Sequence, residues 1–391
     1  MDPRSVPKEL FKYNNWRYVD KIDRLYRWMN GETAPPYKII IVPTNRCNLN
    51  CFCCPNSFAR TQGRFRAEDE LTKDEWMEVI DTGLGVGVKE WYFLGGGEPM
   101  LHKGTVIDAV TRIKRDHEEN ICEIISNGTL FEKGMIQDLV KLKLNRLLLS
   151  IDGHNSEIHD YVRRKDGAFK RARETLRLFA KYKKKLKSDK PVLQMNCVIS
   201  SRNYDKIAEI TEFAIENDVN ELALHPMREY EETRHQVQHL KLNREQEKAM
   251  FEGIAKARKI AGKSQMSFNN SMVEESYGGC EEDEEETEII SMDDEQIERK
   301  YLSARCYEPF YSMFIDPKGN ANFCCAAGDG RDENNIRQGL EKVWYGAFFN
   351  RIREKVRRNE ATEKCHNCGL LDMTRELRED LRKYVYYLKN G

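Results

Sequence analysis

The stretch YKIIIVPTNRCNLNCFCC, residues 37–54, runs from an apolar segment directly into a loop that carries four cysteines. The Ile and Val residues at 39–42 have the composition of a strand that is buried on both faces. Three of the cysteines, Cys47, Cys51 and Cys54, follow the spacing C-x3-C-x2-C. The loop therefore begins where the strand ends, and parallel α/β folds build their active sites at that edge of the sheet.

Further short apolar segments follow the first one, and amphipathic helical patterns separate them. The strand candidates are rich in Ile, Leu and Val and lie at 37–43, 89–95, 121–126, 146–152, 192–200 and 221–226. The helix candidates lie at 72–84, 104–117, 132–143, 167–187 and 203–217. Successive βα units predict a parallel sheet with right-handed crossovers. Six units are too few for a complete eight-stranded barrel, so we expect an α/β fold with a partial (β/α)6 TIM-like barrel.

Changes of pattern divide the chain into four expected regions. They are an N-terminal helical extension at 1–36, a barrel core at 37–228, a helical connection at 229–305 and a C-terminal domain at 306–391. The connection contains a helical pattern at 243–261 and the acidic run EEDEEE at 281–286, which is typical of a solvated linker. The C-terminal domain is expected to hold a hairpin at 311–325, an amphipathic helix at 339–358 and a last helix near 370–389.

Composition limits the classes of partner and compartment. The formal net charge is −1, which gives no general attraction to nucleic acid or to anionic lipid. No segment approaches the ~20 apolar residues of a membrane span, and the N-terminus has no apolar signal core. We therefore expect a cytoplasmic protein. Twelve cysteines, most of them in tight groups, then indicate metal binding more than disulfides. Cys122 and Cys197 lie in apolar runs and are predicted to be core residues.

Three thiolates from one loop can hold three irons of a [4Fe–4S] cluster and leave the fourth iron without a protein ligand. An open metal position is typical of a catalytic site. Spacing alone leaves zinc as an alternative. The C-x3-C-x2-C motif after a first strand resembles the signature of the radical SAM superfamily, which implies such a cluster together with S-adenosylmethionine. That family has an aromatic residue before the third cysteine, whereas this chain has Cys53 there and Phe52 one place earlier. Cys53 is therefore an alternative to Cys54 as the third ligand.

Two strand ends add to the resemblance. Leu94-Gly95-Gly96-Gly97-Glu98-Pro99 follows the second strand and could be a plain turn or a backbone that approaches a ligand closely. It is similar to the GGEP motif of the family, so Gly96, Gly97 and Glu98 are expected to hold the methionine amine. Asn127, after the third strand, occupies a position similar to the Asn of the family's TNGT motif.

The fourth strand ends in Ser150-Ile151-Asp152-Gly153, whose short polar side chains could bind ribose hydroxyl groups. The family has a similar strand end, so Ser150 and Asp152 are expected to bind S-adenosylmethionine. His159-Asp160 and Arg163 then resemble an HDxxR stretch, in which the arginine pairs with the methionine carboxylate.

A second set of cysteines lies near the C-terminus, at Cys306, Cys324, Cys365 and Cys368. Four thiolates can fully ligate one cluster or one zinc ion, and spacing does not separate the two. The arrangement resembles the twitch, or shortened SPASM, domain of radical SAM enzymes, which implies one auxiliary [4Fe–4S] cluster. Cys280 and Cys325 are interpreted as bystanders, although Cys325 could replace its neighbour.

The resemblance implies reductive cleavage of S-adenosylmethionine to a 5′-deoxyadenosyl radical, with an electron from a reductant such as flavodoxin or ferredoxin. The radical would take hydrogen from a substrate C–H bond, and the auxiliary cluster would accept the remaining electron, so the net reaction would be an oxidation. The first hypothesis is a small polar substrate such as a sugar, cyclitol or amine. The substrate-side candidates follow strands five and six: Asn196, His225, Arg228 and Tyr230.

Two alternatives stay open. One is a peptide- or protein-modifying maturase that makes a crosslink or oxidises a side chain; the 36 residues before the first strand are short for a leader-peptide-binding domain. The other is a zinc-stapled adaptor without enzymatic activity. The sequence does not identify the substrate, the catalytic acid or base, the role of the acidic run or the oligomeric state.

Overall fold

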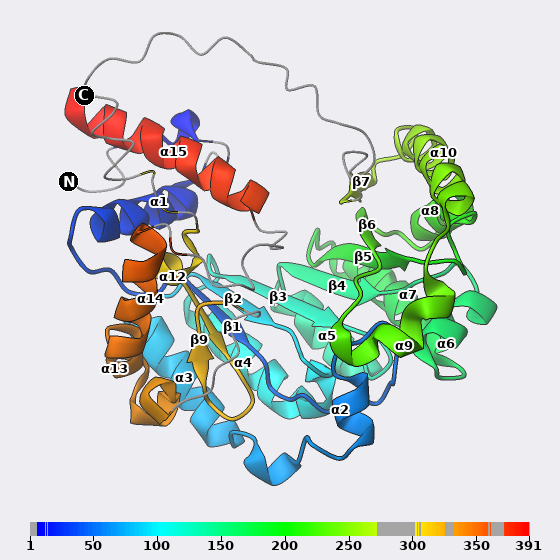
Figure 1. Cartoon of the computed structure of the whole chain (residues 1–391), viewed down its shortest axis with the longest axis horizontal. Coiled ribbons are helices and arrows are strands. Elements are labelled where there is room, and N and C mark those ends of the chain that lie inside the picture. The colour runs from blue at the N-terminus through cyan, green and yellow to red at the C-terminus, as the bar shows by residue number, and fades with distance from the viewer. Residues whose placement is uncertain are drawn as a thin grey trace. The chain divides into compact units, whose positions relative to one another are not determined.

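A computed structural model describes residues 6–271, 306–324, 332–358 and 371–390, apart from residues 12 and 14, together with residues 302, 304 and 360 (Figure 1). The chain forms two compact units. One unit consists of residues 1–40, 74–91 and 281–391, and the other of residues 41–73 and 92–280. Two of the boundaries between the units fall within the first two strands, after residue 40 and after residue 91.

The larger unit contains a run of parallel strands. It contains β3 (Ile121–Ser126), β4 (Arg146–Ser150), β5 (Val192–Ile199), β6 (Glu221–Pro226) and β7 (Ser267–Asn270). It also contains the last residues of β1 (Lys38–Ile41) and of β2 (Glu90–Phe93). Strands β3 to β7 pair in sequence order, each parallel to the next. The predicted parallel α/β fold is confirmed. The sequence analysis missed β7, because its segment SFNN is polar and shows no apolar alternation.

Helices connect these strands. They are α2 (Ser57–Thr61), α4 (Lys103–Asp116), α5 (Lys133–Lys141), α6 (Ser156–Arg163), α7 (Ala168–Leu186), α8 (Ile207–Glu216), α9 (Arg234–Val237) and α10 (Arg244–Ala261). Helix α6 was not predicted as a helix, although it carries the HDxxR residues. Its N-cap is Asn155, whose side chain accepts a hydrogen bond from the Ile158 backbone N–H, and its C-cap Arg164 has a positive φ of 54°. These two caps confine α6 to a short segment directly after β4.

The buried residues of the strands form the core of this unit. Strands β3 and β5 bury every second residue, as half-covered strands do. Cys122 and Cys197 lie on these two strands and are fully buried, so their prediction as core residues is confirmed. The register of the pairs Ser126↔Leu149, Ser150↔Asn196 and Val198↔His225 aligns the carboxyl ends of β3 to β6 along one edge. Polar residues from distant parts of the sequence therefore meet at that edge.

The other unit is built mostly from helices and one hairpin. Its elements are α1 (Trp16–Met29), α3 (Lys73–Gly85), α12 (Glu308–Tyr311), β8 (Ser312–Ile315), β9 (Ala321–Asn322), α13 (Leu340–Trp344), α14 (Ala347–Arg357) and α15 (Leu371–Asn390). Strands β8 and β9 form the predicted antiparallel hairpin. Helices α1 and α15 are joined by hydrogen bonds from the Tyr18 hydroxyl to Asp380 (2.8 Å) and from the Tyr384 hydroxyl to Asp23 (2.7 Å).

The prediction of one continuous helix at 339–358 is wrong, because the helix is interrupted near its centre. The structure ends α13 at Trp344 and begins α14 at Ala347. Gly346 lies between them in an extended conformation (φ −75°, ψ 173°), and a Cβ atom there would be 2.6 Å from the Lys342 carbonyl oxygen. Apolar periodicity continues across this break, which is why the pattern alone did not show it.

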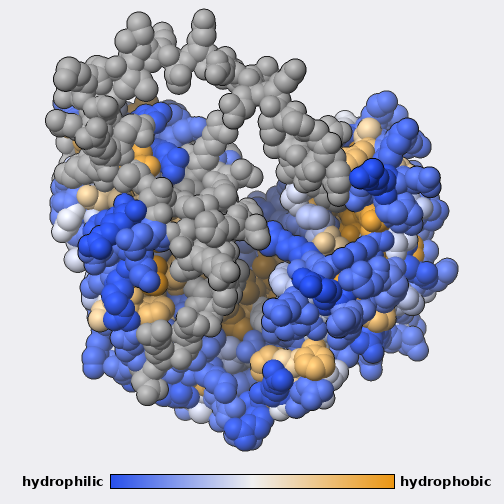
Figure 2. All heavy atoms as spheres, viewed as in Figure 1, coloured by the Kyte–Doolittle hydropathy of each residue, from blue (hydrophilic) through white to orange (hydrophobic). Residues whose placement is uncertain are grey.

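The visible surface is mostly hydrophilic, in keeping with a chain in which 33% of the residues are charged (Figure 2). Apolar side chains appear on it as separate small patches. Among the described residues, no helix combines the length and the apolar composition that crossing a membrane requires.

The inner face of α3 generates a stability prediction. A Cβ atom at Gly83 would be 2.4 Å from the Trp91 ring and 3.3 Å from Ile39, and both of these side chains are fully buried. Gly83→Ala should therefore lower the free energy of unfolding by about 1–3 kcal/mol through overpacking. Gly85, in the same helix, has no atom within 4 Å of its added Cβ and provides the control. Urea denaturation checks the pair; equal stability of the two variants would contradict the packing seen here.

Candidate functional site

The loop after β1 gathers four thiols. Cys47, Cys51, Cys53 and Cys54 pack together with Leu49 and the buried Ala168. All four cysteines are free thiols. The Cys54 N–H donates to the Cys51 carbonyl (3.3 Å), and the Phe52 N–H donates to the Val162 carbonyl in α6 (3.1 Å). The loop is therefore a tight turn anchored on the end of α6.

Different donors contact three of these sulfur atoms. Arg60, on α2, donates from Nη2 to the Cys54 Sγ (3.0 Å), and Arg163, on α6, lies with its Nη1 3.7 Å from the Cys51 Sγ. The Leu49 backbone N–H donates to the Cys47 Sγ (3.4 Å). Within the described part of the chain, no hydrogen bond reaches the sulfur of Cys53. Cys54 and Cys53 thus differ in their surroundings, and the motif position Cys54 has the charge-assisted contact.

Burial favours the protonated form of three of these thiols, those of Cys47, Cys51 and Cys53. It raises the pKa of Cys47 to about 11 and the pKa of Cys53 to about 12, and it also raises the pKa of Cys51. A cysteine side chain binds a metal as its thiolate. Binding of a metal centre would therefore release protons, and the positive charge of the centre together with Arg60 and Arg163 would stabilise the thiolates.

The glycine run after β2 packs against the cysteine loop. The Gly97 N–H donates to the Thr44 carbonyl (3.1 Å), and the Glu98 N–H donates to the Arg46 carbonyl (2.9 Å). A Cβ atom at Gly97 would be 1.9 Å from the Arg46 carbonyl oxygen, and one at Gly96 would be 2.0 Å from Asn45 Oδ1. Asn56 and Arg60 also donate to the Gly96 carbonyl (2.7 and 3.1 Å). Besides the ligand-binding role that the sequence suggested, these glycines allow two loops to touch.

Glu98 joins the ends of β2 and β3. Its carboxylate is 1% exposed and accepts hydrogen bonds from the Ser126 hydroxyl (2.7 Å), the Met100 N–H (3.0 Å) and the Asn127 N–H (2.8 Å). Burial raises the pKa of Glu98, while these donors favour its ionised form. The side chain of Asn127 in turn donates to Asn48 in the cysteine loop (2.9 Å). Both predicted residues therefore lie in one network with the loop.

Asp152 and Arg163 form a buried ion pair at the end of β4. Arg163 Nε lies 2.8 Å from Asp152 Oδ2, and Asp152 is completely buried. Burial opposes the charge of Arg163, but Asp152 together with Cys51 and Cys53 outweighs this effect and raises the pKa of the guanidinium group. His159 accepts the Asp152 backbone N–H at its Nδ1 (3.1 Å), and burial, helped by Arg163, holds the pKa of His159 well below its usual value. His159 and Arg163 of the HDxxR stretch thus both contact Asp152 at the end of β4.

The remaining predicted residues are less tightly connected. Ser150 lies opposite Asn196 in the β4–β5 register, and Asn196 Oδ1 accepts a hydrogen bond from Gln194 (2.7 Å). His225 lies on β6 with its Nδ1 3.1 Å from the Ser271 hydroxyl. Arg228 and Tyr230 follow β6 in an irregular segment, and the Tyr230 side chain is exposed.

The second cysteine group is only partly described. Cys306 and Cys324 are free cysteines of intermediate exposure in the hairpin unit. Cys365, Cys368, Cys325, Cys280 and the acidic run at 281–286 lie outside the described residues.

The donor set, three motif thiols on one loop, fits an iron–sulfur cluster. A zinc ion would draw its sulfur ligands to about 2.3 Å from one point. Among the residues that the structure describes, no three His, Cys, Asp or Glu side chains converge in that way. A cubane cluster instead binds each cysteine at a different iron, so its ligands lie further apart. The C-x3-C-x2-C motif supplies three such cysteines from a single loop.

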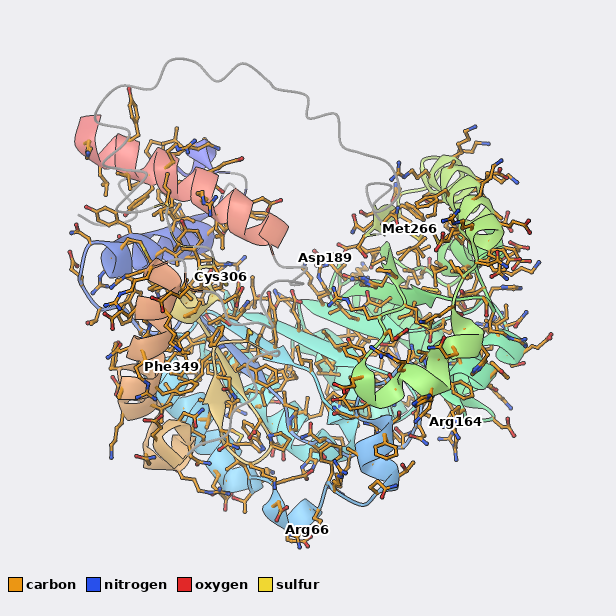
Figure 3. The ribbon with its side chains drawn as sticks, viewed as in Figure 1. Arg66, Arg164, Asp189, Met266, Cys306 and Phe349 are labelled. Atoms are coloured by element: carbon orange, nitrogen blue, oxygen red, sulfur yellow. The ribbon has the colours of Figure 1, made fainter. Side chains whose placement is uncertain are left out.

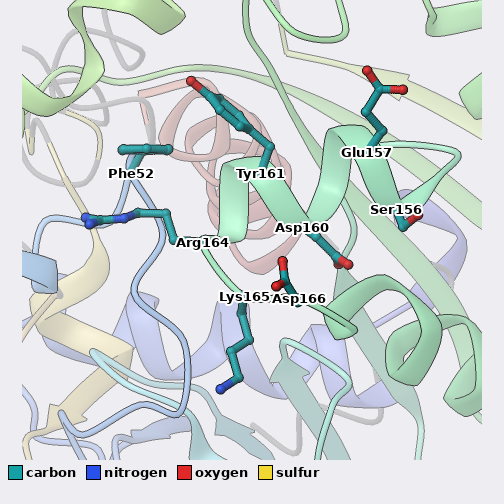
Figure 4. A pocket seen from close by; sticks show the side chains of 8 residues that line it. All are labelled: Phe52, Ser156, Glu157, Asp160, Tyr161, Arg164, Lys165 and Asp166. Atoms are coloured by element: carbon teal, nitrogen blue, oxygen red, sulfur yellow. The ribbon is translucent and has the colours of Figure 1, made fainter.

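A pocket of about 770 Å³ lies beside the cysteine loop (Figure 4). Phe52 points into it, with its ring 5.5 Å from the Tyr161 ring and the Arg164 guanidinium 4.9 Å from its centre. Arg164 lies on the outer surface of the unit (Figure 3). Phe52 therefore packs against Tyr161 of α6, against the C-cap residue Arg164 and against His239.

Sequence reasoning missed several residues of the site. Arg60 contacts Cys54 from the short helix α2, and an arginine six residues after a cysteine carries no motif signal. Ser271 follows β7, the strand that was not predicted. Arg46, Glu70 and His102 form a cluster under the loop, in which Arg46 Nη2 and His102 Nε2 each lie 2.9 Å from Glu70 Oε2. Their contacts depend on the fold, which the sequence pattern does not give.

Comparisons with known proteins agree with this geometry. Residues 41–214 match the family model of the radical SAM superfamily, and residues 306–369 match the SPASM iron–sulfur cluster-binding domain. The chain is thus a radical SAM protein with a C-terminal SPASM domain. The first domain implies a [4Fe–4S] cluster with S-adenosylmethionine, and the second implies auxiliary iron–sulfur clusters.

Individual relatives match only part of the chain. An AdoMet-dependent heme synthase of Methanosarcina barkeri is 32% identical over 188 residues, which are 48% of this chain and 50% of that protein. A PqqA peptide cyclase of Granulibacter bethesdensis is 27% identical over 180 residues, 46% of this chain and 44% of that protein. The chain thus spans about half the length of the curated relatives it matches.

The fold agrees over a longer stretch. The structure of Streptococcus suis SuiB bound to S-adenosylmethionine has a TM-score of 0.60 at 19% identity and covers 91% of this chain and 76% of its own. At 19% identity, this similarity indicates a shared fold and nothing more.

The loop contact gives a first prediction for the site. Gly97→Ala places a Cβ atom 1.9 Å from a backbone carbonyl oxygen, so one of the two loops must move. The variant should lose most of the iron that the first cluster contributes after anaerobic reconstitution, as measured by iron and sulfide analysis. Gly104→Ala, whose added Cβ has no atom within 4 Å, should keep the full iron content. A Gly97→Ala protein with normal iron content would refute the packing argument.

Arg60 gives a second prediction. Hydrogen bonds to cluster sulfur atoms stabilise the reduced, more negative form and raise the reduction potential. Arg60→Met removes the donor 3.0 Å from the Cys54 sulfur and should lower the midpoint potential of the first cluster by on the order of 40 mV, equivalent to about 1 kcal/mol. Titration monitored by electron paramagnetic resonance checks this. Arg64→Met, nearby in the sequence, is the control, and equal potentials in both variants would disprove the effect.

Proposed function

We propose that this radical SAM enzyme binds its catalytic [4Fe–4S] cluster through Cys47, Cys51 and Cys54 and oxidises a C–H bond of a small polar substrate. The observation that carries the proposal is the loop itself, in which three motif thiols from one turn have separate donors at their sulfur atoms. When bound, the cluster and S-adenosylmethionine supply a 5′-deoxyadenosyl radical that takes a hydrogen atom from the substrate. The residues of the chain then have to orient both molecules and exclude water.

Arg163 is suited to orient S-adenosylmethionine. Its Nε faces Asp152 and one Nη faces Cys51, so the guanidinium is fixed in direction. Arginine has five N–H donors, and these two contacts leave others for a carboxylate. The buried Asp152 keeps the arginine charged and in place before the ligand arrives. We therefore assign Arg163 to the methionine carboxylate and Asp152 mainly to Arg163.

The glycine loop and Glu98 complete this side of the proposed site. Each oxygen of the Glu98 carboxylate already accepts hydrogen bonds from the chain, but a carboxylate has about four acceptor sites. Gly96, Gly97 and Glu98 can therefore still receive the methionine amine, with Asn127 beside them. Ser150, at the end of β4, is the remaining candidate for the ribose.

We assign the C-terminal cysteines Cys306, Cys324, Cys365 and Cys368 to one auxiliary cluster within a domain at 306–391, after a radical SAM core at 37–228. Four protein ligands leave no iron free for the substrate, so this cluster is suited to electron transfer. Acceptance of one electron after loss of a hydrogen atom makes the overall reaction an oxidation. A reductant such as flavodoxin or ferredoxin would supply the first cluster from the cytosol.

A peptide substrate is the second candidate. The similarity to PqqA peptide cyclases supports it, although that similarity covers 46% of this chain. A zinc-stapled adaptor has less support, because the radical SAM match favours an enzyme.

The ligand assignment is tested by a matched pair of cysteine variants. Cys51→Ala should abolish formation of 5′-deoxyadenosine from S-adenosylmethionine and dithionite, because one iron loses its anchor. Cys53→Ala should retain it, since Cys53 lacks the donors that surround the motif sulfurs. Liquid chromatography with mass detection measures the product. Retention of cleavage by Cys51→Ala, or its loss only in Cys53→Ala, would overturn the ligand set.

The substrate class is tested by isotope transfer. C-deuterated sugars, cyclitols and amines are incubated with the reconstituted enzyme, and deuterium in 5′-deoxyadenosine identifies the class that is attacked. A parallel incubation uses a deuterated peptide mixture. Transfer only from the peptides would replace the small-substrate proposal with the maturase.

A further inference from the structure

His225 and Ser271 form a short hydrogen-bonded chain at the end of β6. The Nδ1 atom of His225 lies 3.1 Å from the Ser271 hydroxyl oxygen. That hydroxyl lies 2.9 Å from the Leu224 carbonyl oxygen, which also accepts the Ser271 backbone N–H at 3.1 Å. Ser271 is held beside β6 through the β7 pairing, in which Leu224 lies opposite Asn270.

These distances determine which imidazole nitrogen carries the proton. A serine hydroxyl has one hydrogen to donate. If it donated to His225, its lone pairs would face the Leu224 carbonyl oxygen at 2.9 Å, and two acceptors would be in contact. If it donates to Leu224, it accepts from His225 Nδ1–H, and both contacts are satisfied. The second arrangement leaves the Nε2 atom of His225 with an unprotonated lone pair.

The surroundings keep this imidazole neutral. Partial burial and the nearby Arg228 lower the pKa of His225, while Asp152 acts in the opposite direction. Within the described residues, Nε2 of His225 has no hydrogen-bond partner. A neutral imidazole with a free Nε2 lone pair is a proton acceptor.

His225 also lies at the edge of the sheet where the proposed site is formed. It pairs in register with Val198, and the Val198 N–H donates to Asp152 Oδ1 (3.0 Å). Asp152 in turn holds Arg163, which contacts Cys51. Four successive contacts therefore connect His225 with the cysteine loop, all within one compact unit.

We propose that His225 Nε2 accepts the proton released when the substrate is oxidised, and that Ser271 is the positioning residue that fixes its tautomer. This inference rests on the proposed function. Oxidation of H–C–O–H to C=O removes one hydrogen atom from carbon, one proton from oxygen and one electron. In this balance His225 would take the proton, S-adenosylmethionine bound at the first cluster would supply the acceptor of the hydrogen atom, and the auxiliary iron–sulfur cluster would supply the acceptor of the electron. An amine, H–C–N–H, loses the same three particles to give an imine.

The tautomer is tested directly, without a substrate. The full-length reconstituted enzyme is labelled with ¹⁵N-histidine, and two-bond ¹H–¹⁵N correlation spectra are recorded near pH 8; His225→Gln assigns the signal. The wild type should show His225 protonated at Nδ1. Ser271→Ala should shift it toward the Nε2-protonated form, and Ser271→Thr should restore the wild-type pattern. His235→Gln, at an exposed position, should leave the His225 signal unchanged. An Nε2-protonated His225 in the wild type overturns the proposal.

The catalytic role is tested by the ratio of two products, measured with the deuterated alcohol or amine that transfers its label. Deuterium in 5′-deoxyadenosine reports C–H abstraction, and the carbonyl or imine product reports completed oxidation. In His225→Gln, oxidised product per labelled 5′-deoxyadenosine should fall by about 10²–10⁴-fold, the usual contribution of a general base. Ser271→Ala should give a smaller fall that Ser271→Thr restores.

The outcomes separate the two levels of the proposal. An unchanged product ratio in His225→Gln overturns the role of His225 and leaves the proposed function standing. Absence of deuterium transfer from every alcohol and amine in the wild type overturns the proposed small-substrate oxidation, and with it the proton acceptor.

Discussion

The contact between the cysteine loop and the glycine run after β2 is the constraint on which the site depends. Backbone donors of Gly97 and Glu98 bind carbonyl groups of the cysteine loop, and the space between the loops is too small for a Cβ atom. Two loops from neighbouring strands thereby become one rigid surface. A metal centre bound to three sulfurs of a mobile loop would be poorly defined, so in the proposed site this contact would fix the position of the cluster.

Two buried carboxylates extend that rigidity across the sheet edge. Glu98 ties β2 to β3 through three donors, and Asp152 ties β4 to α6 through Arg163 and to β5 through the Val198 N–H. A buried charge without partners would be strongly destabilising, and a paired one gives position rather than net stability. At this edge of the sheet, the buried charges thus lie where the positions of ligands matter in the proposed site. His225 continues the same pattern one strand further, with a neutral group in place of a charged one.

The parallel fold could be predicted from the sequence, and the predicted residues Glu98 and Asp152, with Arg163 paired to Asp152, lie at strand ends along one edge of the sheet, because the signals for both are local. Apolar strands followed by cysteine, glycine or short polar residues can be recognised one strand at a time, and parallel pairing then brings their ends together. The contacts between side chains could not be obtained in this way. Nothing near Arg60 signals that α2 turns it toward Cys54, and Ser271 follows a strand whose polar residues show no period. The break at Gly346 was hidden for the opposite reason, since the apolar pattern runs through it.

The difference between Glu98, Asp152 and His225 suggests how one sheet edge can support two kinds of chemistry. Near the cysteine loop the carboxylates of Glu98 and Asp152 are buried and engaged by hydrogen bonds and an ion pair, so they serve to hold position. At β6 the imidazole is neutral and only one of its nitrogens is engaged, so it can change its protonation state. Radical formation needs fixed charges around a cluster, whereas completion of an oxidation needs a group that takes up a proton. Asp152 follows β4 and His225 lies on β6, so the two kinds of group lie two strands apart in the sheet. The hydrogen bond from Val198 to Asp152 links them, because Val198 pairs with His225.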